Sequence, residues 1–270
     1  MGSNQIEFLP LDKSWYIRLC ILSLQTDDDS VIKFLNSKES CDDLKSTVNA
    51  VKNFHQQIID VGESATLLRF LKFYCWKNNI DKKFIVGPML KKRKVCNDKD
   101  IINLSLEKLL KLDCGTSQWA SASILMGNNE DIKTDNEKIL MSKRAVKFWN
   151  NREKIGIVID KVIEKQAKYF LGYDSTFEYS SAEDYCFARA FNLITKDGGS
   201  RLWPQLINHE SNRLNEMEEQ IDKTYITSDD HRVIQALLLK AKLDNKIIKI
   251  KNRNAVNKSW PEFWKFYEQG

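Results

Sequence analysis

The chain contains few of the residues that mark linkers, metal sites or disulfide frameworks. Only four prolines and ten glycines occur among its 270 residues, and no low-complexity stretch divides it. The three histidines lie far apart, and the six cysteines form no C-x-x-C pair. The sequence therefore lacks the ligand spacing of a structural zinc site, and we expect reduced thiols and no bound metal.

Long apolar runs and a targeting signal are also lacking. No window approaches 18 uninterrupted apolar residues, so no transmembrane helix is expected. The opening MGSNQIEFLPLDKSW has neither the basic start nor the apolar run of a secretory signal. Together with the scattered cysteines, these features predict a cytoplasmic protein. The length allows one large domain or two small domains, each with a real core.

The chain carries no large excess of positive or negative charge. Its 42 basic residues are interleaved with 37 acidic residues, which leaves a net charge of only +5. The two most basic stretches are LKKRKV (90–95) and KIIKIKNR (246–253). Neither carries a recognised nucleic-acid-binding motif. We therefore expect neither a nucleic-acid nor a membrane partner, but a monomeric protein with pockets for small anions.

Apolar periodicity predicts an α/β protein in which helices dominate. The expected strands are three short runs, KFIVG (83–87), IGIVI (155–159) and KIIKI (246–250). The expected helices cover about 15–24, 43–58, 64–76, 101–111, 117–126, 138–149, 182–195, 208–221 and 231–243.

Six of these helices follow a short polar loop that presents hydroxyls, free backbone amides or an arginine. Such helix starts bind anions readily, because their amides are unpaired and the helix dipole is positive there. The same residue types are also ordinary helix caps, so capping alone is the competing explanation. The six loops are LDKSWYIR (11–18), VGESATLLR (61–69), DCGTSQWA (113–120), YSSAEDY (179–185), INHESNR (207–213) and TSDDHR (227–232).

The last of these loops opens the stretch ITSDDHRVIQALLLKA (226–241). Ser228 and Asp229 are natural N-caps for the helix that its apolar spacing predicts. Arg232 is unexpected there, because a cation in the first turn opposes the helix dipole. Either Arg232 holds an anion, or the cluster is a solvated helix start of mixed charge.

Read in order, seven segments resemble the enolpyruvyl transferases, and most closely the 5-enolpyruvylshikimate-3-phosphate synthases. The opening Lys-Ser loop and the closing Lys-Ser-Trp-Pro-Glu-Phe run are similar to the family's two ends, and the others follow in the family's order. These segments are LPLDKSWYIRLCILSL (9–24), NSKESCDDLKSTVNAV (36–51), VGESATLLRFL (61–71), MLKKRKV (89–95), GTSQWASASILM (115–126), NHESNRLNEM (208–217) and, as one match, ITSDDHRVIQALLLKA (226–241), which resembles the family's Asn-Asp-His-Arg helix, together with NAVNKSWPEFWKFYEQ (254–269).

The resemblance implies an α/β fold of two lobes, an inverse α/β barrel built from repeated β-α units, with one lobe reduced. Residues 1–10 and 180–270 would form the reduced N/C-terminal lobe, and residues 11–179 the central lobe. The active site would lie in the cleft between the lobes. The chain would cross from one lobe to the other near Leu11 and again near Ser180.

The resemblance also implies a reaction. An enolpyruvyl group would pass from phosphoenolpyruvate to the hydroxyl of shikimate-3-phosphate or a related phosphorylated acceptor, by addition and then elimination of phosphate. This step of the shikimate pathway of aromatic amino acid biosynthesis needs no metal and no cofactor. The alternative is a catalytically inactive relic of the fold that binds an anionic ligand or a partner.

Residue roles follow from the resemblance position by position. Lys13 and Glu210 would act in catalysis, with Glu210 transferring a proton, and Arg69 and Gln118 would contact substrate. His231 would lie beside the phosphate. The acceptor would be bound by Ser14, Arg18, Thr116 and Ser117, and phosphoenolpyruvate by Arg93, Arg213, Arg232 and Lys258.

The chain departs from the family in several places. It lacks about one structural unit between Asn150 and Glu210, where the family has a catalytic aspartate. Asp184 is its equivalent in one alignment, whereas an alternative alignment leaves that aspartate deleted. Four further replacements lie at or near the substrates: Glu63 for Asn, Ala65 for Gly, Lys138 for Tyr and His209 for Lys.

Overall fold

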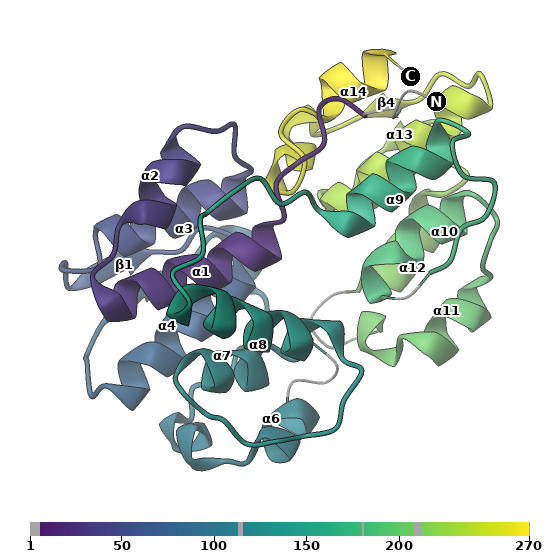
Figure 1. Ribbon diagram of the computed structural model, residues 1–270. Coiled ribbons are helices and arrows are strands. Elements are labelled where there is room, and N and C mark those ends of the chain that lie inside the picture. The colour runs from purple at the N-terminus through teal and green to yellow at the C-terminus, as the bar shows by residue number, and fades with distance from the viewer. Residues whose placement is uncertain (1–5, 113–115, 180, 208–211, 270) are drawn as a thin grey trace. The chain divides into compact units, whose positions relative to one another are not determined.

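The computed structural model describes residues 6–112, 116–179, 181–207 and 212–269, which divide into two compact units (Figure 1). Unit 1 comprises Met1–Asp12 with Ile159–Gly270, and unit 2 comprises Lys13–Val158. The first crossing thus lies beside the expected position at Leu11. The second lies at Val158, so residues 159–179 belong to unit 1 and not with the central part of the chain.

Unit 2 is mostly helical and contains one short parallel sheet. Strands β1 (Ile58–Asp60) and β2 (Lys83–Ile85) pair in parallel, with Ile59 opposite Phe84. The helical elements are α1 (Lys13–Thr26), α2 (Ser30–Asn36), α3 (Asp42–Lys52), α4 (Ala65–Lys77), α5 (Pro88–Lys91), η1 (Lys99–Asn103), α6 (Leu106–Leu112), α7 (Gln118–Leu125) and α8 (Glu137–Asn150).

Helix α7 is the central helix of unit 2. All of its residues from Trp119 to Leu125 are buried, as expected for a helix that is apolar or small on every side. It packs against α4, α6 and α8, while α1 packs against α3, α4 and α8. This arrangement brings the first turns of α1, α7 and α8 into hydrogen-bonding contact.

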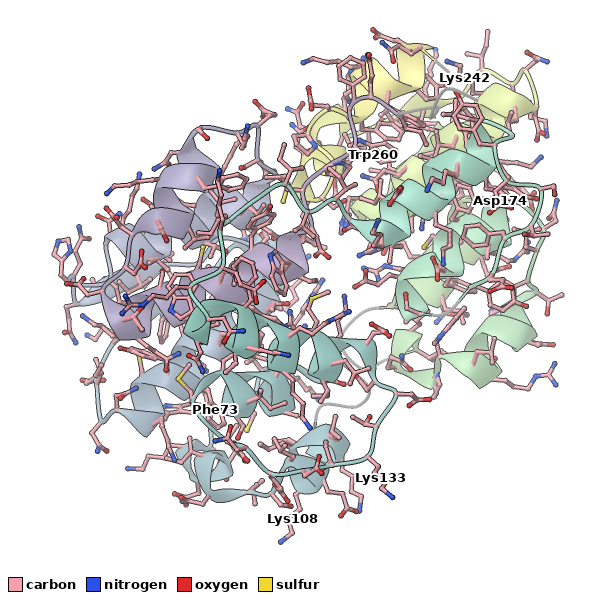
Figure 2. All side chains as sticks on the ribbon, viewed as in Figure 1. Phe73, Lys108, Lys133, Asp174, Lys242 and Trp260 are labelled. Atoms are coloured by element: carbon pink, nitrogen blue, oxygen red, sulfur yellow. The ribbon has the colours of Figure 1, made fainter. Side chains whose placement is uncertain are left out.

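Unit 1 is also mostly helical and is held together by an aromatic core. Trp260, Phe263 and Phe266 pack edge to face or tilted, and Trp260 (Figure 2) donates a 2.7 Å hydrogen bond to the Phe8 carbonyl. The N-terminal segment is thereby fixed to the C-terminal part of the chain. The elements are α9 (Lys161–Phe170), η2 (Ala182–Asp184), α10 (Tyr185–Ala190), α11 (Lys196–Leu202), η3 (Pro204–Leu206), α12 (Arg213–Gln220), β3 (Tyr225–Ile226), α13 (His231–Leu243), β4 (Lys249–Ile250), η4 (Arg253–Lys258) and α14 (Phe263–Gln269).

The prediction of an α/β protein dominated by helices is confirmed, and each expected helix overlaps a helical element. The strand expected at 155–159 is wrong, because only Ile159 forms a bridge, to Leu11. Its backbone is bonded to a side chain instead: Tyr16 Oη donates to the Gly156 carbonyl and accepts from the Val158 amide. Among the described residues, no helix is long and apolar enough to cross a membrane.

Candidate functional site

Four of the residues assigned to the substrates or to catalysis meet in unit 2 at the first turns of α1, α7 and α8. We call the partly exposed or polar residues there the helix-start cluster. It consists of Lys13, Ser14, Ser117, Gln118, Asn136 and Lys138.

Arg18 lies beneath this cluster and joins its three helices. Its side chain is buried, with 2% of the residue exposed. Nη1 donates to the Ser14 carbonyl at 2.7 Å, and Nη2 to Ser121 Oγ at 3.1 Å and the Lys138 carbonyl at 3.3 Å. Nε donates to Ser142 Oγ at 2.8 Å. Every nitrogen of the guanidinium group is thus bonded to the protein, so Arg18 positions the helices rather than facing a ligand.

Lys138 and Asn136 connect the upper part of the cluster. Lys138 Nζ donates to Ser14 Oγ at 3.3 Å, across 124 residues of sequence. Asn136 caps α8 through its side-chain oxygen and donates from Nδ2 to Ser117 Oγ at 2.7 Å. Ser117 has a left-handed backbone, with φ of 57°. A cation and several hydroxyls therefore surround three helix starts, whose dipoles are positive.

Two further predicted residues border the cluster. Arg69 is buried and donates from Nη1 to Gln118 Oε1 at 2.5 Å, while its guanidinium lies over the Trp119 ring. Lys13 at the start of α1 forms an ion pair of 2.8 Å with Asp43 of α3. The contact with Gln118 orients the Arg69 side chain, and the contact with Asp43 orients the Lys13 side chain. The resemblance places both Arg69 and Lys13 at the substrates.

Glu63 has a structural role of its own in unit 2. Its carboxylate accepts hydrogen bonds from the backbone amides of Met89 at 3.0 Å and Leu90 at 2.6 Å, at the start of α5. Gly87 leaves room for it, because a Cβ there would lie 2.2 Å from Glu63 Oε1. The carboxylate that departs from the family pattern is therefore held by a helix start.

Replacing Glu63 with alanine should lower the free energy of unfolding by about 1 kcal/mol, because the first amides of α5 lose their acceptor. Thermal or urea unfolding measures the change. Glu107→Ala is the matched control, since Glu107 is exposed and forms only an i,i+4 pair with Lys111; it should stay within about 0.5 kcal/mol of the wild type. Equal stability of all three proteins would contradict the capping role.

In unit 1, Arg213 and His231 meet at Asp230. Arg213 Nε and Nη2 both donate to Asp230 Oδ2 at 2.9 Å, and both side chains are largely buried. Burial by itself raises the pKa of Asp230, but the adjacent Arg213 and His231 outweigh it and hold that pKa well below its usual range. This ion pair involves Nε and Nη2 of Arg213, and Nη1 takes no part in it.

Arg232 has a carboxylate neighbour of its own. Its Nη2 lies 3.1 Å from Glu183 Oε2, and its Nη1 donates to the Glu183 carbonyl at 3.5 Å. This ion pair offsets the unfavourable position of a cation in the first turn of α13. The predicted caps Ser228 and Asp229 were wrong by one or two residues, because Asp230 caps α13 through the Arg232 amide.

Asp184 is fully buried in unit 1 and serves as a structural group. Its Oδ2 accepts from Lys165 Nζ at 2.8 Å and from the Ser181 amide at 3.2 Å, completing a capping box at η2. Lys165 also donates to the Glu178 carbonyl at 2.8 Å. A catalytic role for Asp184 stays a prediction.

The remaining predicted residues are scattered. Arg93 follows α5 and is partly exposed, Lys258 ends η4, and Thr116 precedes the left-handed Ser117. Glu210 and His209 lie outside the described residues. The six polar loops do precede helical elements as expected, insofar as the structure describes them.

Several residues that form buried polar contacts were not predicted from the sequence. Ser121 and Ser142 accept from Arg18, and Glu218 accepts from Arg189 at 2.7 Å and 3.0 Å. The sequence signal for Ser121 and Ser142 was the position of a polar residue on the apolar side of a predicted helix. A hydroxyl that is buried there needs a hydrogen-bond partner.

Comparison with protein-family models, with curated proteins and with solved structures finds no match to this chain. The chemistry of the site must therefore be read from its residues. Unit 2 brings cations and hydroxyls to three helix starts, which suits a phosphate or carboxylate. In unit 1 the arginines at α12 and α13 are each paired with a carboxylate.

Proposed function

We propose that this protein is a shortened enolpyruvyl transferase that binds shikimate-3-phosphate, or a related phosphorylated acceptor, at the helix-start cluster. The observation that carries the proposal is the hydrogen bond from Lys138 Nζ to Ser14 Oγ, next to that from Asn136 to Ser117. Through the start of α8, these two bonds connect Ser14 and Ser117, which the family resemblance assigns to the same acceptor but which lie about a hundred residues apart in the sequence. Three helix starts supply the positive field that an anionic acceptor needs.

The proposed reaction is the transfer of the enolpyruvyl group of phosphoenolpyruvate. The acceptor hydroxyl attacks the central carbon of the enolpyruvyl group. At the same time, the methylene carbon of the enolpyruvyl group takes up a proton and becomes a methyl group. Loss of that methyl proton and departure of phosphate then restore the double bond. Glu210 is the proposed proton-transfer residue, and Lys13 is proposed to lie near the reacting carbon, its ammonium oriented by Asp43.

A second candidate function, anion binding without catalysis, is favoured by one observation in unit 1. Arg213 and Arg232, the arginines assigned to phosphoenolpyruvate, are each held by a carboxylate at 2.9 Å and 3.1 Å. Such pairs compete with a ligand carboxylate or phosphate for the same donors. In this case the acceptor would bind to unit 2 but no phosphate would be released.

Acceptor binding is tested by calorimetric titration with shikimate-3-phosphate. We expect binding that weakens as salt rises from about 50 mM to about 500 mM, because charged contacts are screened. Lys138→Gln should weaken binding by roughly tenfold to a hundredfold, since it removes one charge-assisted contact. The matched control is Lys143→Gln on the same helix, where Lys143 lies 3.6 Å from the exposed Asp131.

Two outcomes would contradict acceptor binding at the helix-start cluster. One is the absence of any binding heat to the folded protein at either salt concentration. The other is equal weakening by Lys138→Gln and Lys143→Gln, which would indicate a general charge effect and not a site.

A further inference from the structure

The net charge of the protein is concentrated in one segment of unit 1. Residues 240–253, KAKLDNKIIKIKNR, contain six lysine or arginine residues and one aspartate, a local charge of +5. The rest of the chain has 36 basic and 36 acidic residues, because the totals are 42 and 37. The whole excess of positive charge thus belongs to these 14 residues.

The segment runs from the last turns of α13 through a turn into β4 and η4, and its apolar residues divide into two sets. Ile248 and Ile250 pack against the core of unit 1. Ile247 is 89% exposed and Leu243 is 50% exposed. Ile247, Lys249 and Lys251 alternate with the inward-facing isoleucines, as strand geometry requires. An aliphatic side chain therefore projects from the most basic surface of the unit.

Aromatic residues border this surface. Tyr225 is exposed and lies opposite Lys249 in the parallel β3–β4 pair. The Arg253 guanidinium lies 3.7 Å from the centre of the Trp264 ring, and Lys242 lies over Tyr267. Figure 2 labels Lys242, which lies at the periphery of unit 1, whereas Trp260 lies in its core. We call Lys242, Leu243, Lys246, Ile247, Lys249, Lys251 and Arg253 with Tyr225 the basic isoleucine surface.

We propose that the basic isoleucine surface binds the surface of an anionic lipid bilayer. Its lysines and arginine match the negative charge of acidic headgroups, and Ile247 and Leu243 enter the boundary between headgroups and acyl chains. Exposed aliphatic side chains gain free energy when they leave water, and one basic cluster with such residues is typical of peripheral membrane contact. Membrane binding by this surface departs from the expectation of no membrane partner, which was based on the sequence.

The same features fit a nucleic acid less well. A nucleic acid attracts lysines equally, but it provides no apolar layer for Ile247 and Leu243. Stacking of successive bases needs a series of open aromatic faces. Here Arg253 lies over Trp264 and Lys242 over Tyr267, and the exposed Tyr225 is a single ring. The bilayer is therefore the partner that uses both the charge and the exposed aliphatic residues.

Co-sedimentation of the full chain with lipid vesicles tests this proposal, and it does not depend on enolpyruvyl transfer. We expect binding to vesicles of phosphatidylcholine with about 30% phosphatidylserine, little binding to pure phosphatidylcholine, and release at about 500 mM salt. The triple variant K246Q/K249Q/K251Q should weaken binding by roughly a hundredfold, at about fivefold for each lysine. I247S should weaken it by about tenfold.

Ile157→Ser is the matched control, because Ile157 is an isoleucine of unit 2 that is 62% exposed; its binding should equal that of the wild type. All substitutions lie on exposed side chains, and circular dichroism melting verifies that the variants fold. Three results would overturn the proposal: no binding to anionic vesicles, equal binding to neutral vesicles, or unchanged binding of I247S. Binding to a single-stranded oligonucleotide but not to vesicles would assign the surface to nucleic acid.

Discussion

Replacing Asp230 with alanine should lower the free energy of unfolding by about 3–5 kcal/mol, because it removes one partner of a largely buried ion pair. The change leaves the Arg213 guanidinium without the carboxylate that accepts from its Nε and Nη2 at 2.9 Å. It also removes the cap of α13, since Asp230 Oδ1 accepts from the Arg232 amide at 2.9 Å. Denaturant unfolding monitored by circular dichroism measures the loss.

Asp229→Ala is the matched control for this prediction. Asp229 is the neighbouring residue, but it is exposed and lies outside the Arg213–Asp230 pair, and its side chain accepts a hydrogen bond from Asn252 at 3.0 Å. Its replacement should change the free energy of unfolding by no more than about 0.5 kcal/mol. Similar losses in the two variants would show that the Arg213–Asp230 pair contributes nothing specific.

The effect of Asp230→Ala should also depend on pH. The pKa of Asp230 is lower in the folded protein than in the unfolded chain, so its contribution is complete above the unfolded value of about 3.9. It is lost as pH falls from there toward the folded-state pKa. The difference in free energy of unfolding between wild type and variant should therefore be constant near pH 7 and shrink below about pH 4. A difference that grows on acidification would contradict the pairing.

Replacing Arg18 with alanine should destabilise unit 2 by about 3–5 kcal/mol. The change leaves a cavity where a buried arginine joins α1 to α7 and α8, and it removes four hydrogen bonds. Arg18→Met should cost less, because it fills most of the volume, whereas the hydrogen bonds that Ser121 and Ser142 donate to the Lys138 carbonyl remain in both variants. Thermal unfolding of the two variants separates cavity from hydrogen-bond effects.

Arg144→Ala on α8 is the control for Arg18, because Arg144 is exposed and pairs only with the exposed Glu137 at 3.4 Å. It should leave stability within about 0.5 kcal/mol of the wild type. If Arg18→Ala were as mild as Arg144→Ala, the buried arginine would not be what holds the three helix starts together.

Local sequence signals predicted where most helices lie but not which residues meet. Caps and apolar spacing place α4, α8 and α13 within a few residues, because these signals are local. The IGIVI run failed as a strand since Tyr16, 140 residues away, bonds its backbone. The ion pair of Arg232 with Glu183 could not be predicted from the sequence either, because no local pattern identifies a partner 49 residues distant. The unfavourable dipole position of Arg232 did signal that some anion was needed, and the structure supplies a carboxylate.

The contact between Lys138 and Ser14 also joins residues that lie far apart in the sequence. The resemblance assigned Ser14, Thr116 and Ser117 to one acceptor, but it gave no place to Asn136, which bonds Ser117. Such contacts depend on how α1, α7 and α8 pack, and packing is decided by many apolar residues together. The sequence therefore predicts candidate residues for the site, and the folded chain decides which of them are adjacent.

The most direct test of the proposed function is phosphate release from the full chain mixed with phosphoenolpyruvate and shikimate-3-phosphate. Enolpyruvyl transfer predicts release only when both substrates are present, falling by roughly a hundredfold in Glu210→Gln. Binding of shikimate-3-phosphate without any release would support the non-catalytic alternative. Neither release nor binding by the folded protein would contradict the account.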